Sequence, residues 1–396
     1  MNSVGSGRTT PCCTKRSPNC ASSSPWTDDR AVDVRERVDV AVIGGGQAGL
    51  AVGYYLRRAG LSFVILDDQE DPGGAWRHVW PSLRLFSPAE YSSLPGRLMP
   101  RTAGGNPDPD HVIRYLADYE ERYSLPVVRP VRVDQVVQTS EGFQLLTDAG
   151  EWRARAVVNT TGTWSQPFWP TMPGQRNFRG SQIHSADYRG PQQFEGQSVL
   201  VVGGANSAAQ IAADLARAAT VTWCLRGAPR YLPDDVDGRE LFRVASQRVR
   251  ALAAGEPDSG GVADLGDIVA VPPVKKARGA GLLIPHPMFE RFTPDSVIWN
   301  DGSTRRIDTV IWCTGFRPAL RHLHKLNLRE SDGTIKLNGT ASPRIPGLYF
   351  AGYGDWTGPG SATLIGVGST AKATVGAIAG DLESATTAAA ISARAR

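Results

Sequence analysis

The chain has 396 residues, of which 41% are hydrophobic and 21% are charged, and its formal net charge is +4 at pH 7. A chain of this length folds into about two or three domains, and so small a net charge does not indicate a nucleic-acid partner. No apolar run approaches the ~20 residues of a membrane-spanning helix. The composition therefore argues against integral membrane, fibrous and largely disordered proteins.

The two ends of the chain differ in composition from its centre. Residues 1–35 are rich in Ser, Thr, Pro and Gly, contain Cys12, Cys13 and Cys20, and lack the apolar segment of a secretory signal. We expect a disordered tail there and a cytoplasmic protein; binding of thiophilic arsenic by these cysteines is an alternative. A flexible tail that frays or forms a weak helix is expected over 382–396. The sequence has no CxxC, which weighs against a dithiol oxidoreductase.

A G-x-G-x-x-G sequence lies between a predicted strand, Val38–Ile43, and a predicted helix that ends near Leu56. Its glycines are Gly44, Gly46 and Gly49. The first permits a tight turn, the second lets a pyrophosphate approach the helix N-terminus, and the third lets helix and strand pack closely. A second strand, Phe63–Leu66, is followed by Asp67, where a carboxylate would bind ribose hydroxyls. This unit predicts a dinucleotide site.

The same unit occurs a second time along the chain. The strand Ser198–Val202 leads into the turn Gly203–Ala208, and the next strand, Thr220–Leu225, is followed by Arg226. An arginine can pair with a 2′-phosphate that a carboxylate would repel. The first unit is therefore predicted to bind FAD and the second NADPH. Two alanines replace the usual glycines of the second turn and leave less room for a pyrophosphate, so a purely structural relic is the alternative.

Two further predicted strands end in a Thr-Gly pair, namely Thr161 with Gly162 and Thr314 with Gly315. Such pairs place close-approaching backbone at the ligand edge of a parallel sheet and mark crossovers between nucleotide domains. A last strand, Leu348–Ala351, runs into a turn with Asp355, which suits a carboxylate facing a flavin. The predicted fold is α/β, with two Rossmann-like dinucleotide-binding domains, the NADPH domain being inserted into a split FAD domain. The predicted parts are 36–166 (FAD domain, first part), 167–307 (NADPH domain) and 308–381 (FAD domain, second part).

Several short motifs add to this organisation. They are Gly73–Trp76, Leu83–Pro88, Ser93–Gly96, Cys313–Pro318 and a linker motif formed by Phe178, Gly180, His184 and Tyr188. On these motifs the chain resembles class B flavin-containing monooxygenases with two dinucleotide-binding domains, from about Val38 to Ile378. It is more narrowly similar to the ArsO-like branch of bacterial arsenic-resistance gene clusters. The segments that carry this narrower likeness are Asp234–Arg239, Gly266–Val269 and Gly352–Gly358.

The resemblance implies roles for individual residues. The residues implied to contact FAD are Gly44, Gly46, Gly49, Asp67, Gly74, Trp76, Ser87, Thr161, Gly162 and Asp355. Those implied to contact NADPH are Gly203, Asn206, Ser207, Arg226, Thr314 and Gly315. Ser87 and Asn206 are candidate supporting residues for chemistry that takes place on the flavin, and His184 is expected to fix the linker. Two positions depart from the family, since Gln210 stands where Glu is common and Ser87 lies near the place of an Asn.

The implied activity is that of an NADPH-dependent FAD monooxygenase. NADPH would reduce FAD, and reduced flavin would trap O2 as a C4a-(hydro)peroxide that gives one oxygen atom to a small soft nucleophile. The nucleophile is sulfur, nitrogen, arsenic or a carbonyl compound, and a link to arsenic resistance is one possibility. The alternatives are an uncoupled NADPH oxidase or flavin reductase, and a non-catalytic redox sensor that binds flavin and nucleotide. The oligomeric state is not readable from the sequence.

No metal site is predicted. The acids Asp234, Asp235 and Asp237 are interpreted as a turn before a helix, because no other oxygen ligands lie nearby. A metal at His322 and His324 lacks supporting cysteines or acids. The basic run of Lys275, Lys276 and Arg278 is interpreted as a solvated face, with an NADPH phosphate contact as the alternative.

Overall fold

The structure is a computed structural model of the whole chain. It describes residues 34–103, 105–234 and 268–394, together with 243–244, 247–248, 251 and 254–255. Val34–Arg396 is one compact unit, and the other unit, Met1–Asp33, lies outside the described residues. The predictions for the N-terminal tail and for Asp235–Arg239 and Gly266–Asp267 therefore also fall outside them. The helices within the described ranges are α1 (Gln47–Arg58), α2 (Pro109–Arg122), α3 (Asn206–Leu215), α6 (Pro272–Gly279), α7 (Val367–Arg394) and the 3-10 helices η1 (Gly74–His78), η2 (Ala89–Tyr91), η3 (Gln175–Asn177), η4 (Gln192–Phe194), η5 (Arg321–Leu326) and η6 (Gly354–Trp356).

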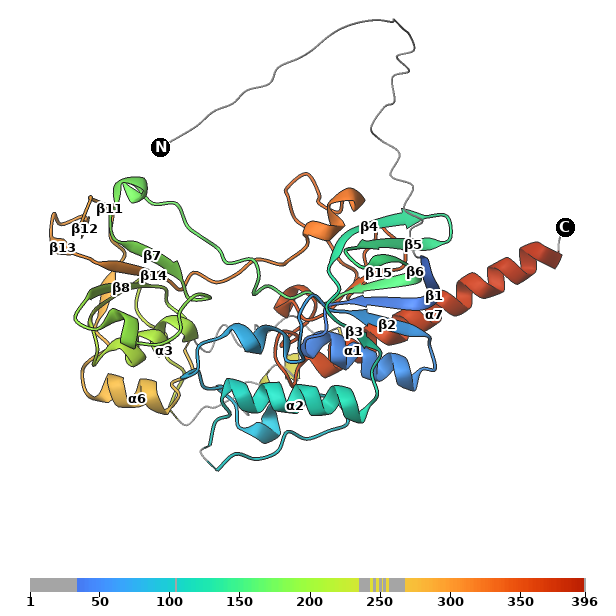
Figure 1. Cartoon of the computed structure of the whole chain (residues 1–396), viewed down its shortest axis with the longest axis horizontal. Helices are drawn as coiled ribbons and strands as arrows, with labels where there is room; N and C mark the ends of the chain where they lie inside the picture. Colours follow the sequence, from blue (N-terminus) through green and yellow to red (C-terminus); the bar gives the residue numbers. More distant parts are fainter. Residues whose placement is uncertain are drawn as a thin grey trace, which may run out of the picture. The chain divides into compact units, whose positions relative to one another are not determined.

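The first sheet contains the first glycine-turn unit (Figure 1). Its strands, in order across the sheet, are β3 (Val127–Val128), β2 (Phe63–Leu66), β1 (Val34–Ile43), β6 (Gly150–Asn159), β5 (Gly142–Thr147) and β4 (Val133–Thr139), and β15 (Leu348–Phe350) also pairs with β6. The pairs of β1 with β2 and β6 are parallel, whereas β4, β5 and β6 are antiparallel neighbours. Because β15 comes from the C-terminal part of the chain, this domain is split in sequence, as predicted.

Both faces of the first sheet are covered, which explains the nearly continuous apolar sequence of β1. Side chains alternate between the faces of a strand. Val40 and Val42 join a core with α1, α2 and α7, and Figure 1 shows α1 and α2 on one side of this sheet. Ala41 and Ile43 pack on the opposite face, in a core that includes the β4–β5 hairpin and η5.

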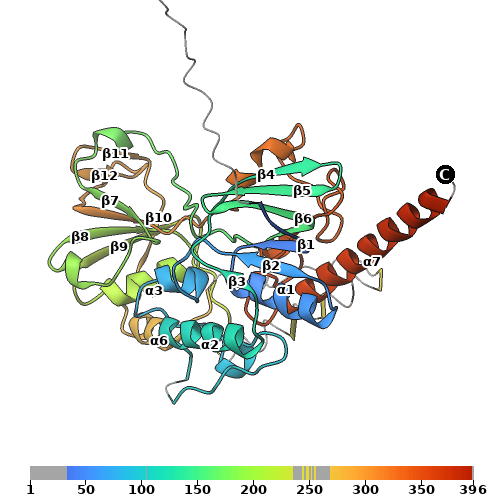
Figure 2. The same ribbon diagram turned by 45° about the vertical axis from the view of Figure 1, so that its right-hand side comes forward.

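The second sheet repeats the parallel part of the first, without its antiparallel strands (Figure 2). Its strands are all parallel and lie in the order β10 (Pro285–Pro287), β9 (Thr220–Leu225), β8 (Ser198–Val202), β14 (Thr309–Trp312) and β7 (Ser181–His184). Val199 and Val201 of β8 share a core with α3 and α6. Leu200 and Val202 pack on the other face, in a core with the short antiparallel sheet. That third sheet consists of β11 (Arg291–Phe292), β12 (Ser296–Ile298) and β13 (Thr304–Arg306).

Strand β14 shows that the predicted domain boundary at residue 308 is wrong. The chain was expected to return to the FAD domain there, but β14 pairs with β7 and β8 of the second sheet. A Thr-Gly strand end marks the ligand edge of either sheet, so the local pattern does not decide which sheet the strand joins. The return follows β14, where two crossover segments run side by side. The Phe168 N–H donates to the Gly315 carbonyl and the Ala319 N–H donates to the Gly162 carbonyl, both at 2.9 Å.

Helix α7 extends through the segment from residue 382, where a flexible tail that frays or forms a weak helix was predicted, and it is helical through Arg394. The Ala-rich sequence favours a helix, and tertiary contacts hold it. Ala371 and Ile378 lie in the first core. Arg155 of β6 donates to the Leu382 carbonyl at 3.2 Å and to Thr386 Oγ1 at 3.1 Å.

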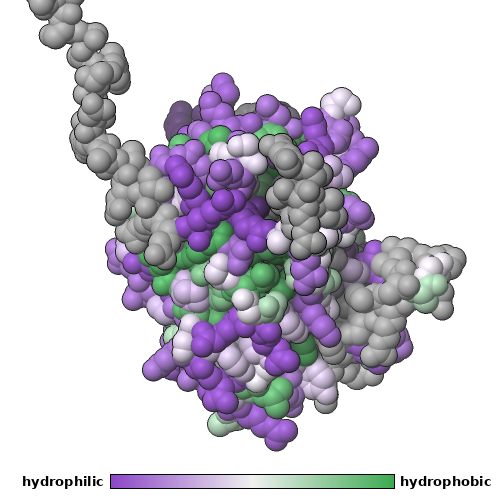
Figure 3. All heavy atoms as spheres, turned by 90° about the vertical axis from the view of Figure 1, so that its right-hand side faces the viewer, coloured by the Kyte–Doolittle hydropathy of each residue, from purple (hydrophilic) through white to green (hydrophobic). Residues whose placement is uncertain are grey.

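The outer surface is mixed in character. Hydrophilic side chains make up much of the face in Figure 3, with smaller groups of apolar side chains between them. Among the residues that the structure describes, the exposed large hydrophobic side chains are Leu98, Trp169, Leu282, Ile284 and Phe316. Within the described ranges, no helix has both the length and the apolar sequence required to cross a bilayer.

Candidate functional site

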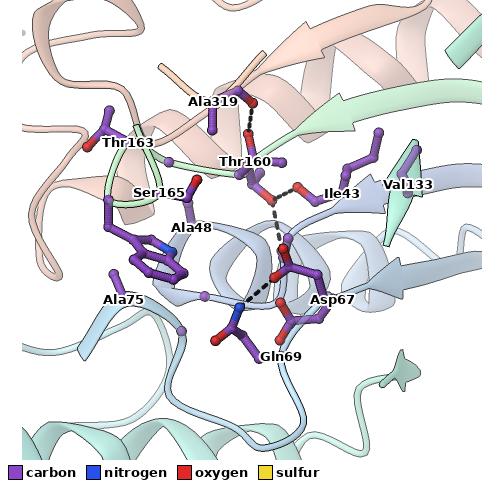
Figure 4. Close-up of a pocket in the computed structure, with 18 of the residues that line it drawn as sticks. Ile43, Ala48, Asp67, Gln69, Ala75, Val133, Thr160, Thr163, Ser165 and Ala319 are labelled. Atoms are coloured by element: carbon purple, nitrogen blue, oxygen red, sulfur yellow. Dashed lines mark hydrogen bonds between the residues drawn. The ribbon is translucent and has the colours of Figure 1, made fainter. Parts of the chain in front are cut away.

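A cavity of about 870 Å³ opens at the C-terminal ends of β1, β2 and β6. We call it the first cavity. Figure 4 shows strand-end residues such as Ile43, Asp67 and Thr160 around it. The residues predicted for FAD that line it are Gly44, Gly46, Asp67, Gly74, Trp76, Thr161 and Gly162. Seven of the ten residues predicted for FAD are thus brought together at one cavity.

The glycine turn forms a cradle that larger residues would fill. Gly44 has a φ of +104°, and a Cβ there would lie 2.7 Å from the Thr160 carbonyl oxygen. A Cβ on Gly74 would lie 2.9 Å from the Gly46 Cα. Helix α1 begins after Gly46 with no side-chain cap and no acidic residue in its first turn. A helix N-terminus of this kind attracts a pyrophosphate, so the cavity fits FAD.

Gly49 does not line the first cavity but supports it from behind. A Cβ at this position would lie 1.9 Å from the Gly44 carbonyl oxygen and 3.1 Å from Thr160 Oγ1. The same Thr160 hydroxyl donates to the carbonyls of Ile43 and Gly44, at 2.8 and 2.9 Å. Close packing of the helix on the turn, which was the role predicted for Gly49, is what the structure shows.

Asp67 belongs to a buried ion-pair network that the sequence did not reveal. Arg129 Nε lies 2.7 Å from Asp67 Oδ2, and its Nη1 lies 2.6 Å from Glu120 Oε1. Burial opposes the charge of Arg129, but the hydrogen bonds and Coulomb attraction of Glu120 and Asp67 outweigh it and raise the arginine pKa. The network holds the Asp67 carboxylate at the cavity wall. Arg129 is 62 positions away from Asp67 in sequence, so no local pattern connects them.

A second network supports the opposite wall of the first cavity. His322 Nε2 lies 2.6 Å from Asn159 Oδ1, and the Asn159 amide donates to the Tyr353 hydroxyl. That hydroxyl is 2.9 Å from Thr161 Oγ1, which donates to the Ala319 carbonyl. Burial lowers the pKa of His322 to about 4, so the ring is neutral at pH 7. In the sequence, His322 was weighed only as a metal ligand, and no local pattern connects it with Asn159.

Aromatic stacking lies beside the first cavity. The rings of His78, in η1, and Trp164, in the first crossover segment, are parallel with centroids 3.7 Å apart. His78 Nε2 is 2.6 Å from Gln69 Oε1, and Gln69 and Trp164 both line the cavity. Segments far apart in sequence thus meet at this wall.

A second cavity, of about 210 Å³, adjoins the first, because Trp76 and Ala362 line both. Its wall is largely apolar and aromatic and brings together Ser87, Asn206 and Ser207. Asn206 Oδ1 accepts a hydrogen bond from the Val269 N–H at 2.8 Å. Residues predicted separately for the flavin and for the nicotinamide nucleotide therefore share one cavity.

The second glycine turn resembles the first in geometry. Gly203 has a φ of +152°, and a Cβ there would lie 2.3 Å from the Cys313 carbonyl oxygen. Helix α3 begins after Ala205 with no side-chain cap and no acidic residue in its first turn. Arg226 follows β9 and is exposed to solvent. This donor set fits the pyrophosphate and the 2′-phosphate of NADPH.

Thr314 and Gly315 have a structural place rather than a place in either cavity wall. Thr314 Oγ1 donates to the Phe168 carbonyl at 2.5 Å, and Gly315 pairs with the other crossover segment. Asp355, which was predicted to face the flavin, lines neither cavity. Its side chain is 67% exposed and lies 3.4 Å from Arg248, because the chain turns into η6 after β15. Gly352 of the same turn lines the first cavity instead.

The linker motif fixes the second domain to the crossover segments. Phe178 is buried, and a Cβ on Gly180 would lie 2.4 Å from its ring. His184 is buried, with the rings of Phe316 and Trp169 at 4.9 and 6.0 Å. Burial lowers the pKa of His184, which agrees with a packing role. The Tyr188 hydroxyl donates to Asp214 at 2.8 Å.

The charged clusters do not form a metal centre in the described part of the chain, where no group of three or more His, Cys, Asp or Glu side chains could hold an ion. Asp234 binds Arg278 at 2.5 Å, and Lys275 donates to the Asp234 carbonyl at 2.6 Å. Two residues of the basic run, Lys275 and Arg278, therefore bind Asp234. Asp235 and Asp237 lie outside the described residues.

Comparison with known proteins agrees with this geometry. The family model described as pyridine nucleotide-disulphide oxidoreductase matches residues 41–253. The chain belongs to this family. It is 32% identical over 338 residues to a CzcO-like oxidoreductase of Geobacillus kaustophilus, covering 85% of this chain and 96% of the relative. It is 27% identical over 388 residues to the indole-3-pyruvate monooxygenase YUCCA4 of Oryza sativa subsp. japonica, covering 84% and 87%.

The structure is also similar to that of a flavin-containing monooxygenase from Stenotrophomonas maltophilia, with a TM-score of 0.80 and 44% identity, over 87% of this chain and 99% of the other. These findings confirm the α/β fold, an NAD(P)H-dependent oxidoreductase, and FAD and NADPH as its cofactors. The ArsO-like branch stays a prediction.

The family name refers to disulphide chemistry, but this chain has no CxxC. Cys224 and Cys313 are both buried in the second domain. Burial raises the pKa of Cys224 to about 12 and also raises that of Cys313. Neither thiol is therefore activated as a nucleophile.

Proposed function

We propose that this oxidoreductase is an NADPH-dependent FAD monooxygenase that transfers one oxygen atom of O2 to a small soft nucleophile. The observation that carries the proposal is the second cavity, where Ser87 meets Asn206 and Ser207 next to Trp76. Residues from both nucleotide units thus border one small apolar space. The likeness to the Stenotrophomonas maltophilia flavin-containing monooxygenase supports the same assignment.

The chain itself would bind, orient and exclude water. FAD would supply the redox chemistry by accepting a hydride from NADPH and passing electrons to O2. The N-terminus of α1 and Gly46 would hold the FAD pyrophosphate, with Asp67 on the ribose. The N-terminus of α3 would hold the NADPH pyrophosphate, with Arg226 on the 2′-phosphate.

The second cavity offers little acid–base chemistry. Its lining, within the described residues, contains no Asp, Glu, His or Cys, and Arg84 is its one ionisable group besides Tyr91. The guanidinium of Arg84 donates to the carbonyls of Pro81 and Leu83, at 3.3 and 2.8 Å. A largely apolar wall without Asp, Glu, His or Cys favours a reaction in which the substrate itself is the nucleophile. Sulfur, nitrogen and arsenic compounds are the proposed nucleophiles, and a carbonyl compound, which would act as an electrophile, is the remaining class. Arsenic resistance rests on the branch resemblance alone.

The proposal is tested by measuring how much of the NADPH consumed ends as H2O2 and how much ends as oxygenated product. The holoenzyme is reduced anaerobically with one equivalent of NADPH and mixed with oxygenated buffer that contains a sulfide, an amine, arsenite or a ketone. We expect one of these compounds to lower the H2O2 formed per flavin to well below one. Stoichiometric H2O2 with every class would identify an NADPH oxidase instead. Failure of NADPH to reduce the flavin would identify a binding protein.

A further inference from the structure

Helix α3 and the segment that precedes Ser87 are joined by a two-way hydrogen-bonded contact. The Arg84 N–H donates to Gln210 Oε1 at 3.1 Å, and Gln210 Nε2 donates to the Arg84 carbonyl at 3.3 Å. The side-chain amide of Gln210 therefore makes the same two hydrogen bonds to the Arg84 backbone that a residue of a neighbouring β-strand would make. One helical turn further on, Asp214 accepts a hydrogen bond from Ser82 Oγ at 2.7 Å.

The contact lies between two anchored parts of the second cavity. The residue after Arg84 is held by the first domain, since the Leu85 N–H donates to the Pro107 carbonyl at 3.0 Å and Asn106 donates to the Leu85 carbonyl at 2.6 Å. Gln210 is one helical turn after Asn206, which lines the same cavity. Gln210, which itself lines the second cavity, thus connects the start of α3 to the Ser87 wall.

We infer that Gln210 is a positioning residue that fixes the nicotinamide-nucleotide helix against the Ser87 wall of the second cavity. The inference rests on the proposed roles of α3 and of this cavity. A glutamine fits this position because its side-chain amide donates one hydrogen bond and accepts another. With glutamate at position 210, an ionised carboxylate could accept a hydrogen bond from the Arg84 N–H, but its other oxygen would face the Arg84 carbonyl oxygen, and both are acceptors. A protonated carboxyl would restore both hydrogen bonds.

The test measures the affinity of the oxidised holoenzyme for NADP+ by titration calorimetry at pH 8 and at pH 6. The affinity of each variant is compared with that of wild type at the same pH. Gln210→Glu and Gln210→Met should both weaken binding about tenfold at pH 8. At pH 6 the Gln210→Glu variant should recover at least about threefold, because partial burial and the facing Arg84 carbonyl oxygen both raise the pKa of a carboxyl. Gln210→Met should not recover. The rate of anaerobic flavin reduction by NADPH should follow the same pattern.

Gln197→Glu is the matched control. The Gln197 side chain also accepts one hydrogen bond, from Thr309 Oγ1 at 2.7 Å, and donates one, to the Gln193 carbonyl at 3.0 Å. It does not line the second cavity. It should bind NADP+ like wild type. Wild-type binding by Gln210→Met, an equal deficit of Gln210→Glu at both pH values, or the same loss in Gln197→Glu would each overturn the inference. Binding needs no oxygen chemistry, so failure of the monooxygenase proposal would be seen separately.

Discussion

Gly49 offers a direct test of how tightly α1 must pack on the glycine turn. In Gly49→Ala the new methyl group would lie 1.9 Å from the Gly44 carbonyl oxygen and 3.1 Å from Thr160 Oγ1. The first of these neighbours is backbone, in the turn that would hold the FAD pyrophosphate. Relief of the overlap therefore requires the helix and the turn to move apart.

The expected cost follows from two opposing effects. Overpacking of a well-packed site costs about 1–3 kcal/mol, and a rigid backbone neighbour places this site at the upper end. Alanine in place of a helical glycine returns about 1 kcal/mol, so we expect a net loss of about 2 kcal/mol. Gly376→Ala is the matched control, because Gly376 is exposed in α7 and a Cβ there meets nothing within 4 Å. It should gain about 0.5–1 kcal/mol.

The assay is urea unfolding of the holoenzymes, followed by circular dichroism, with flavin release recorded in parallel. Gly49→Ala should unfold at lower urea than wild type and release flavin more readily, while Gly376→Ala should unfold at slightly higher urea. A Gly49→Ala protein with the wild-type midpoint and wild-type flavin retention would refute the packing argument.

Three further predictions concern the walls of the first cavity. The pKa of His322 is about 4 in the folded chain and about 6.5 in the unfolded chain. The free energy of unfolding should therefore fall by about 3 kcal/mol as the pH is lowered from 6.5 toward 4. His322→Gln should flatten this part of a stability–pH curve, and an unchanged slope would contradict the assignment. Asp67→Asn removes one ion-pair partner of buried Arg129 and should lower the free energy of unfolding by about 3 kcal/mol. Urea unfolding of the apoprotein measures this loss, and an unchanged free energy would show that Glu120 alone is enough to compensate the Arg129 charge. Trp164→Ala removes the stack on His78 and should weaken FAD binding about three- to tenfold, whereas equal affinity in a fluorescence titration would exclude a role for the stack.

Much of the fold could be predicted because a nucleotide-binding unit is written in local sequence. The turns at Gly44 and Gly203, each between a buried strand and a helix, predicted the parallel strands of both sheets and several residues of the first cavity wall. Local pattern was insufficient where pairing depends on distant strands. It assigned β14 to the wrong sheet, because a Thr-Gly strand end is compatible with either one.

Side-chain orientation and distant partners were the other limits. Asp355 follows a strand, as a flavin-facing acid would, yet the turn into η6 exposes it. The partners of Asp67 and Gln210 lie 62 and 126 positions away, so their contacts exist only once the chain is folded. The C-terminal helix was underestimated because anchoring by Arg155 is likewise a long-range contact.

The central claim is that this chain transfers oxygen from O2 to a substrate. The most direct measurement is turnover with NADPH under 18O2, with each nucleophile class in turn and mass spectrometry of the products. The account predicts one 18O atom in the product of at least one class, with NADPH consumed in proportion. Steady NADPH consumption that yields only labelled H2O2, with no labelled product from any class, would contradict it.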